Sequence, residues 1–315
     1  MRLANGGILV LVCILAYMSG TVKWGQPLGQ PVQVTLLQGN ISQEDKWQPQ
    51  QRVRTMELYK QLTEKHLDSD LIIWPETAIP AFFHNVQDDY LAKLEDEAIA
   101  SKTDLLIGVP VMQTRDGRRF YYNSMVSVGE EQTFYNKQHL VPFGEYVPFG
   151  DLIRRFGGFF NLPMSDFSNG RAEQKPVRVA GNIVGISICY EDAFGEEVIR
   201  NLPQASMLVN VSNDAWFGDS LAPHQHLQIS RMRALETARP MLRATNTGMT
   251  AFVDPKGKII RQAPQFAVAA ITAEIQPMQG ETPYVMFGNY AIVLYALVIL
   301  MIAAIRSRQK SESGL

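Results

Sequence analysis

The chain has 315 residues, enough for one large domain or two small ones. Hydrophobic residues make up 46% of it and charged residues 19%, which excludes a disordered chain, a collagen-like repeat and a coiled coil. A formal net charge of −2 provides no basic footprint for nucleic acid, and two cysteines are too few for a disulfide framework.

The N-terminal segment is apolar. An uncharged stretch runs from Leu3 to Val22, between Arg2 and Lys23, and about 20 such residues suffice to cross a bilayer. A charged start, a short apolar run and small residues also fit a secretory signal peptide. We expect residues 1–27 to be a transmembrane segment with its linker, and a cleaved signal is the alternative.

The middle of the chain, residues 28–283, alternates between short apolar runs and helical patterns. The runs predict strands over Pro31–Gln38, Asp70–Trp74, Leu105–Val111, Tyr121–Val128, Gln132–Tyr135, Asn182–Cys189, Ser206–Ser212, Met249–Val253, Lys258–Arg261 and Ala267–Ala273. Helical spacing predicts helices over Glu57–Leu67, Tyr90–Ser101 and Pro223–Ala238, the last with Leu227, Met232 and Leu235 on its buried face. This alternation indicates an α/β architecture, a sheet covered by helices.

A long segment, His139–Gly170, carries neither pattern. It is rich in Pro, Gly and Phe, and an apolar loop of this length in a compact domain is usually functional or disordered. Its aromatic side chains either pack back onto the core or enter lipid near a membrane anchor.

The C-terminal segment is the clearest membrane signal. No charge occurs from Tyr284 to Ile305, and basic residues follow at once. A basic flank marks the cytoplasmic side of a transmembrane helix. We therefore expect a helix at 284–306, a cytoplasmic tail at 307–315, and residues 28–283 on the far side of the membrane, which in a bacterium is the periplasm or the cell exterior.

Three residues at predicted strand ends are candidates for chemistry. Cys189 ends an apolar strand and suits a reactive nucleophile, although a buried inert thiol is the plain alternative. Glu76 follows another strand and suits a general base, although a helix N-cap or a surface acid would give the same sequence pattern. Lys137 follows the hairpin and suits an oxyanion-stabilising cation, although most lysines are simply solvated.

Other polar residues give weaker signals. Glu145 is an acid within the apolar loop. His224 and His226 are two residues apart and do not face one way on a helix, so we expect no metal site. Helical spacing predicts an intrahelical ion-pair ladder from Arg233, Glu236, Arg239 and Arg243.

Taken together, the motifs resemble a known family. Trp-Pro-Glu, Tyr-x-Lys and Cys-Tyr-Glu in this order resemble the nitrilase, or carbon–nitrogen hydrolase, superfamily with its Glu–Lys–Cys set. Longer strings resemble the bacterial apolipoprotein N-acyltransferase family: WPETAIP (74–80), YNKQHLVPFGEYVP (135–148), SNDAWFG (212–218) and RALETARPMLRATNTG (233–248).

The resemblance implies a fold and site roles. The fold would be an α-β-β-α sandwich ahead of the last transmembrane helix, flanked by transmembrane helices. Glu76 would be the general base, Lys137 the oxyanion-stabilising cation and Cys189 the nucleophile. Four further positions match residues that support the site or lie near the substrate: Glu145, Tyr190, Glu191 and Trp47.

The resemblance also implies a reaction. Cys189 would take an acyl chain from a phospholipid, typically phosphatidylethanolamine, as a thioester and pass it to the N-terminal amine of diacylglyceryl-cysteine on an apolipoprotein. No cofactor is implied, and the location would be the inner membrane with the domain facing the periplasm. The family has several more helices ahead of this domain, so the chain is expected to be a C-terminal part or a shortened form. A membrane-tethered amidase or nitrilase and an inactive lipoprotein-binding form are the alternatives.

Overall fold

The structure, a computed structural model, describes residues 13, 14, 17, 20, 22–129, 131–146 and 167–312. Most of the expected transmembrane segment at 1–27 and positions 147–166 of the expected long loop lie outside the described residues.

The described residues form strands and helices, with two runs of consecutive strands, β4 to β8 and β10 to β14. The strands are β1 (Gln26–Pro27), β2 (Val32–Gln38), β3 (Leu71–Ile73), β4 (Asp104–Arg115), β5 (Arg118–Val128), β6 (Phe134–Asn136), β7 (Val177–Val179), β8 (Asn182–Ile188), β9 (Met207–Ser212), β10 (Met241–Thr245), β11 (Ala251–Val253), β12 (Ile259–Gln262), β13 (Ala269–Ile275) and β14 (Met278–Gln279). The α-helices are α2 (Pro49–Glu64), α3 (Ala92–Ser101), α5 (Gly195–Val198), α6 (Ala222–Thr237), α7 (Pro283–Phe287) and α8 (Tyr290–Glu312). Single turns of other helix types are η1 (Phe83–Asn85), η2 (Gln87–Leu91), η3 (Cys189–Ala193), η4 (Ile199–Asn201) and η5 (Ala215–Phe217).

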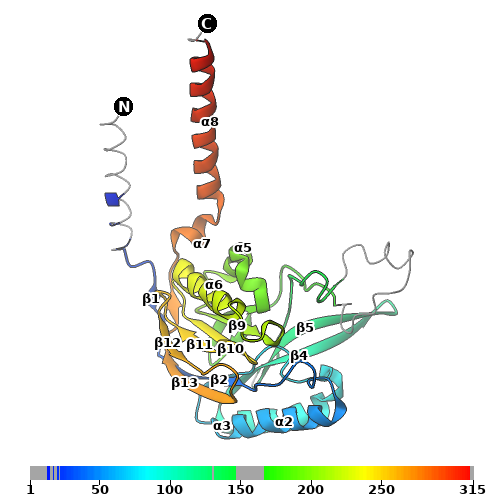
Figure 1. Cartoon of the computed structure of the whole chain (residues 1–315). Helices are drawn as coiled ribbons and strands as arrows, with labels where there is room; N and C mark the ends of the chain where they lie inside the picture. The colour runs from blue at the N-terminus through cyan, green and yellow to red at the C-terminus, as the bar shows by residue number, and fades with distance from the viewer. Residues whose placement is uncertain are drawn as a thin grey trace, which may run out of the picture.

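Twelve of these strands form two six-stranded sheets in the orders β13-β2-β3-β4-β5-β6 and β12-β11-β10-β9-β8-β7, and β1 pairs with β14 in a separate two-stranded sheet. The pairs β2–β3, β3–β4, β8–β9 and β9–β10 are parallel. Helices α2 and α3 lie on the outer side of one sheet and α6 on the outer side of the other (Figure 1). The expected α-β-β-α sandwich is confirmed.

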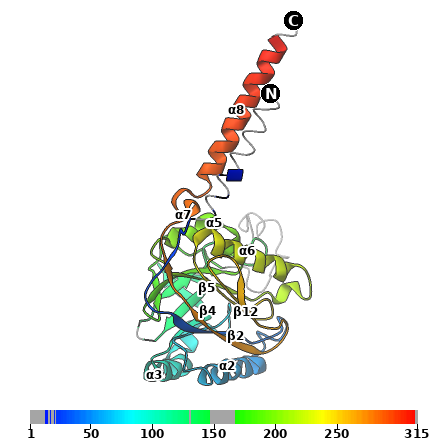
Figure 2. The same cartoon turned by 90° about the vertical axis from the view of Figure 1, so that its left-hand side faces the viewer.

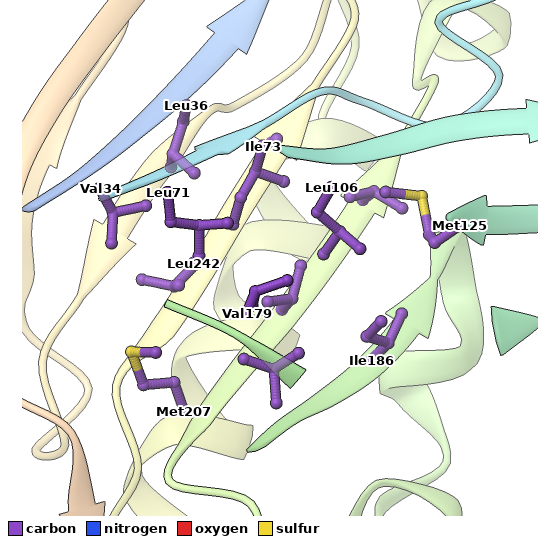
Figure 3. Packing of buried hydrophobic residues seen from close by; sticks show 14 of the residues in the cluster. Val34, Leu36, Leu71, Ile73, Leu106, Met125, Val179, Ile186, Met207 and Leu242 are labelled. Carbon is purple, nitrogen blue, oxygen red and sulfur yellow. The ribbon is translucent and has the colours of Figure 1, made fainter. Parts of the chain in front are cut away.

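The main core lies between the two sheets. Figure 3 shows side chains from one sheet, such as Leu36 and Leu106, facing Ile186 and Leu242 from the other. These side chains are almost completely buried, and removing each from water contributes roughly 1.5–3 kcal/mol to folding. Separate clusters of apolar residues fill the layers under α2 and α3 and under α6. Each sheet is therefore covered on both faces.

The positions of two helices differ from the sequence prediction. Helix α2 begins at Pro49 rather than Glu57, because proline suits the first turn of a helix while the polar turns that follow carry no apolar signal. On α6, Leu227 is buried as predicted, but Met232 and Leu235 are about half exposed. The prediction of that face was wrong because α6 instead buries hydrogen-bonded polar side chains, His226 among them.

The predicted ladder of ion pairs is also wrong. Arg233 and Glu236 do pair, at 3.1 Å, but α6 ends at Thr237 with the next residue in the left-handed conformation. Arg239 therefore lies beyond the helix and Arg243 lies on β10, and both side chains are completely buried. Pro240 is the sequence feature that prevents the helix from continuing.

Helix α8 stands away from the sandwich (Figure 1 and Figure 2). Its stretch Tyr290–Ser307 is long and apolar enough to cross a membrane and is not buried by the protein. Within the described residues, one helix meets these criteria, and it is α8. The helix continues to Glu312, beyond the expected end at 306.

Candidate active site

The three predicted chemical residues each follow a strand. Glu76 lies just past β3, Lys137 just past β6 and Cys189 at the end of β8. Because β3 and β8 belong to the parallel parts of the two packed sheets, their carboxyl ends form an edge at which ligand sites commonly occur.

A glycine lets the loop that carries Glu76 lie against β4. A Cβ at Gly108 would be 2.1 Å from the carbonyl oxygen of Pro75 and 2.6 Å from the amide nitrogen of Thr77. The Gly108 carbonyl also accepts a hydrogen bond from Ile79 at 3.2 Å. No side chain fits at Gly108, because the backbone of the loop that carries Glu76 approaches this position too closely.

Cys189 has a left-handed backbone conformation, with φ of +55°. A non-glycine residue in this region costs about 1–3 kcal/mol and persists only where its surroundings hold it. Glu191 supplies part of that hold, because its Oε2 accepts hydrogen bonds from the Ile188 amide at 2.7 Å and from the Tyr135 hydroxyl at 3.0 Å. The sharp turn ends β8, and η3 begins at Cys189.

Glu76, Lys137 and Glu145 form one buried charge cluster. Nζ of Lys137 lies 3.6 Å from Oε1 of Glu76 and 2.8 Å from Oε2 of Glu145. Nδ2 of Asn123 donates to Oε1 of both carboxylates, at 2.7 and 2.9 Å. The backbone N–H of Asn213 donates to the other carboxylate oxygen of Glu76, Oε2, at 2.8 Å. One cation and two oriented carboxylates thus meet at the edge of the sheets.

The Cys189 thiol belongs to the same electrostatic unit. Burial and the Glu76 carboxylate raise the pKa of the Cys189 thiol to about 12, against the lowering effect of Lys137. Burial lowers the pKa of Lys137, but the negative groups around it, Glu76 first, outweigh burial and hold it above its ordinary value. At neutral pH the site therefore contains a neutral thiol and a charged lysine.

The other predicted site residues lie around this unit in different ways. Glu191 is buried, and its Oε1 accepts from the amides of Gln138 and His139, which follow Lys137. Burial raises the pKa of Glu191 to about 7. The hydroxyl of Tyr190 donates to the Leu140 carbonyl at 3.1 Å. Trp47 is 39% exposed.

Several polar residues of the site were missed in the sequence. Asn123 lies inside β5, and Lys46, the neighbour of Trp47, is buried with Nζ 3.4 Å from the Glu76 carbonyl oxygen. Burial lowers the pKa of Lys46 to about 8. A polar side chain within an apolar strand was the available signal for Asn123, because a buried amide needs partners.

A second group of buried polar residues lies behind Cys189. Asn210 and His226 contact the Cys189 carbonyl, and Arg243 pairs with both Asp192 and Asp214. Among the residues that the structure describes, no group of three or more His, Cys, Asp or Glu side chains is arranged to hold a metal ion.

Comparisons with known proteins agree with this geometry. A family model described as carbon-nitrogen hydrolase matches residues 33–284. The chain is 46% identical over 292 residues to the apolipoprotein N-acyltransferase of Methylococcus capsulatus, covering 93% of this chain and 58% of that protein. It is also 46% identical over 304 residues to the apolipoprotein N-acyltransferase of Nitrosomonas europaea, covering 95% and 61%. The chain thus spans about three fifths of the length of these curated relatives.

Solved structures share the fold at low sequence identity. Nit3 of Saccharomyces cerevisiae, a member of the nitrilase superfamily, matches with a TM-score of 0.57 at 19% identity, covering 79% of this chain and 92% of that one. A carbon-nitrogen hydrolase of Helicobacter pylori matches with a TM-score of 0.57 at 17% identity, covering 78% and 89%. With its sandwich fold, its Glu, Lys and Cys at the strand ends and a family match over most of its length, the chain belongs to the carbon-nitrogen hydrolase family.

Proposed function

We propose that the chain is the catalytic part of an acyltransferase that matures lipoproteins. The acyl chain would come from a phospholipid such as phosphatidylethanolamine and go to the N-terminal amine of diacylglyceryl-cysteine on an apolipoprotein. The observation that carries this proposal is the ion pair of Lys137 with Glu76, electrostatically coupled to the Cys189 thiol, in a chain 46% identical to proteins named apolipoprotein N-acyltransferase.

The first half of the reaction forms a thioester. Glu76 takes the proton of the Cys189 thiol as its sulfur attacks the ester carbonyl of the phospholipid, because a thiol with a pKa of about 12 needs a base. The charged Lys137 stabilises the tetrahedral oxyanion. The carbon–oxygen bond to glycerol then breaks, Glu76 returns the proton to that oxygen, and lysophospholipid leaves.

The second half transfers the acyl group to nitrogen. The free amine of the acceptor attacks the thioester carbonyl, and Lys137 again stabilises the oxyanion. Glu76 removes a proton from the attacking amine and returns it to sulfur as the carbon–sulfur bond breaks. A thioester is an activated acyl donor, so no nucleotide, metal or cofactor enters the balance.

The neighbouring residues would support these steps. Glu145 and Asn123 hold Lys137 and Glu76 in place through the hydrogen bonds described above. Glu191 ties the Cys189 turn to the backbone after Lys137. Tyr190 packs beside that backbone, edge-on to His139. Trp47, partly exposed beside the Lys46 that reaches the Glu76 loop, would contact the substrate.

The proposed setting is the bacterial inner membrane. Helix α8 would anchor the domain, with Arg306 and the residues after it on the cytoplasmic side. Residues 28–283 would then face the periplasm, between a membrane segment at 1–27 and one at 284–306, with a cytoplasmic tail at 307–315. Exposed apolar side chains follow β9 and would offer acyl chains a contact surface: Trp216, Phe217 and Leu221.

The test is transfer by the full chain in detergent, with phosphatidylethanolamine as donor and a diacylglyceryl-cysteine peptide as acceptor. We expect the peptide to gain the mass of one acyl chain with the unchanged protein and not with Cys189→Ala. Release of free fatty acid without acylated peptide would contradict transfer and favour hydrolysis. Cleavage of a small amide instead of lipid would favour a membrane-tethered amidase, and binding of the peptide without any turnover would favour an inactive lipoprotein-binding form.

A further inference from the structure

The carbonyl oxygen of the proposed nucleophile is held by two side chains from outside the Glu–Lys–Cys cluster. Nδ2 of Asn210, on β9, donates to the Cys189 carbonyl at 2.9 Å, and Nε2 of His226, on α6, lies 3.1 Å from the same oxygen. A trans peptide is planar, with its C=O and N–H pointing in opposite directions. Holding this carbonyl therefore also fixes the direction of the Tyr190 N–H, away from His226.

Both ring nitrogens of His226 face acceptors. Nδ1 lies 3.2 Å from Oδ1 of Asp214, and Nε2 lies 3.1 Å from Oδ1 of Asp192 as well as from the Cys189 carbonyl. A neutral imidazole would turn one bare nitrogen toward a carboxylate or carbonyl oxygen. The contacts are satisfied when both nitrogens carry hydrogen, so the ring is an imidazolium.

The surrounding charges support the same protonation state. Asp192, Asp214 and Arg243 are completely buried, and Arg243 lies 2.9 Å from Asp214 and 3.8 Å from Asp192. Two carboxylates and one guanidinium leave one negative charge, which a charged His226 neutralises. Burial and Arg243 lower the pKa of His226, but Asp192 and Asp214 outweigh them and raise it to about 9.

Hydroxyl groups complete the set of groups around the two carboxylates. The Ser230 hydroxyl, one turn after His226 on α6, donates to Oδ2 of Asp192 at 2.5 Å. The Ser212 hydroxyl, at the end of β9, donates to Oδ1 of Asp214 at 2.6 Å. Elements η3, β9, β10 and α6 thus each supply a member to one network behind Cys189.

We propose that His226 is a positioning residue whose imidazolium holds the Cys189 carbonyl and thereby aims the Tyr190 N–H at the oxyanion. His226 touches no substrate, and no proton leaves it during the reaction. A cation bonded to a peptide oxygen also polarises the peptide and strengthens its N–H as a donor. The contact between His226 and the Cys189 carbonyl does not depend on the proposed function, whereas its effect on the oxyanion rests on the proposed thioester reaction.

The contact can be tested without any substrate. The chain has only two cysteines, so labelling cysteine with carbonyl ¹³C gives two signals, and Cys189→Ala assigns them. We expect the Cys189 carbonyl signal of the full chain in detergent to shift with a midpoint near pH 9 as His226 loses its proton. The response should persist in His224→Gln, an exposed histidine on the same helix, and vanish in His226→Gln. A signal that does not change from pH 7 to 10 in the unchanged protein would overturn the proposal.

The consequence for chemistry is tested by the rate of thioester formation, followed by intact mass in a single turnover without acceptor. The rate should fall on the alkaline side near pH 9 in the unchanged protein and in His224→Gln, and be about tenfold or more lower in His226→Gln at pH 7.5. A cooperative thermal unfolding transition, with a Tm close to that of the unchanged protein, checks that this variant is folded. An unchanged rate in a folded His226→Gln would overturn the proposal. If the unchanged protein forms no thioester, the proposed function fails while the carbonyl signal still decides whether His226 holds Cys189.

Discussion

Lys137 and Glu145 form the closest ion pair of the proposed site, with 2.8 Å between Nζ and Oε2 and the lysine almost completely buried. Glu145 is itself fixed, because Oε2 also accepts from the Val141 amide at 2.9 Å. The proposed oxyanion-stabilising cation is therefore positioned by a carboxylate that is not the proposed base. Lys137 thus has a closer carboxylate partner than Glu76, the proposed base.

Removing the charge of Glu145 should slow catalysis without abolishing it. In Glu145→Gln we expect thioester formation to fall by about ten- to a hundredfold, because Lys137 and Asn123 lose an anionic acceptor. Glu173→Gln, at an exposed position, is the control and should keep its full rate. Equal rates for both variants would mean that Glu145 does not position the lysine.

Glu76 and Lys137 should change the reactivity of the thiol in opposite directions. Because Glu76 raises the pKa of Cys189 and Lys137 lowers it, Glu76→Gln should speed alkylation of Cys189 by iodoacetamide and Lys137→Met should slow it. Below the thiol pKa of about 12, the alkylation rate should rise about tenfold for each pH unit.

The same two variants should behave alike in acyl transfer. Both should lose thioester formation from phospholipid, since one lacks the proposed base and the other the proposed oxyanion-stabilising cation. Intact mass after alkylation or acylation, over pH 7 to 9.5, measures both rates. Slower alkylation in Glu76→Gln would refute the electrostatic coupling between Glu76 and Cys189.

Gly108 should tolerate no side chain. In Gly108→Ala the added Cβ would overlap the Pro75 carbonyl, so the loop that carries Glu76 must move, and we expect thioester formation to be lost. Gly185→Ala on β8 is the matched control, because the nearest atom there is the end of the Leu208 side chain at 3.0 Å, which can shift. If Gly108→Ala retains its activity, the loop position does not control the base.

Arg239 should matter for stability and not for chemistry. Its guanidinium is buried, with Nε donating to the Ala205 carbonyl at 2.7 Å and Nη2 to that of Gly280 at 2.8 Å. Arg239→Met would strand these buried acceptors and cost about 2–4 kcal/mol. We expect Tm to fall by several degrees, while Arg54→Met, an exposed position on α2, should leave it unchanged. A Tm equal to that of the control would mean that these carbonyls find other partners.

The sequence predicted the strand ends well, because an apolar run stops where the chain leaves the core. Glu76, Lys137 and Cys189 follow such runs, and their order in the chain sufficed to suggest the family. Asn123 and Asn210 were passed over because each lies within a strand, where a single polar residue does not alter the pattern. Their function depends on partners from other strands of the same sheet or from the segments that follow those strands, which spacing along one strand cannot reveal.

Helix α6 illustrates the opposite error. Its apolar residues gave a plausible buried face, yet the helix buries His226, Ser230 and Thr237, since their polar atoms find partners in the network behind Cys189 and along the helix. Arg243 was assigned to this helix by spacing alone, although Pro240 separates them. Burial of a charged residue is decided by the countercharges it meets, and Asp192 and Asp214 come from other elements.

The most direct test of the proposed chemistry is the intact mass of the detergent-purified chain after incubation with phosphatidylethanolamine alone. The proposed mechanism predicts a gain of one acyl chain on the unchanged protein, absent in Cys189→Ala and removed by hydroxylamine or by a diacylglyceryl-cysteine peptide. Absence of any adduct on a protein whose Cys189 still reacts with iodoacetamide would contradict acyl transfer from phospholipid by this chain.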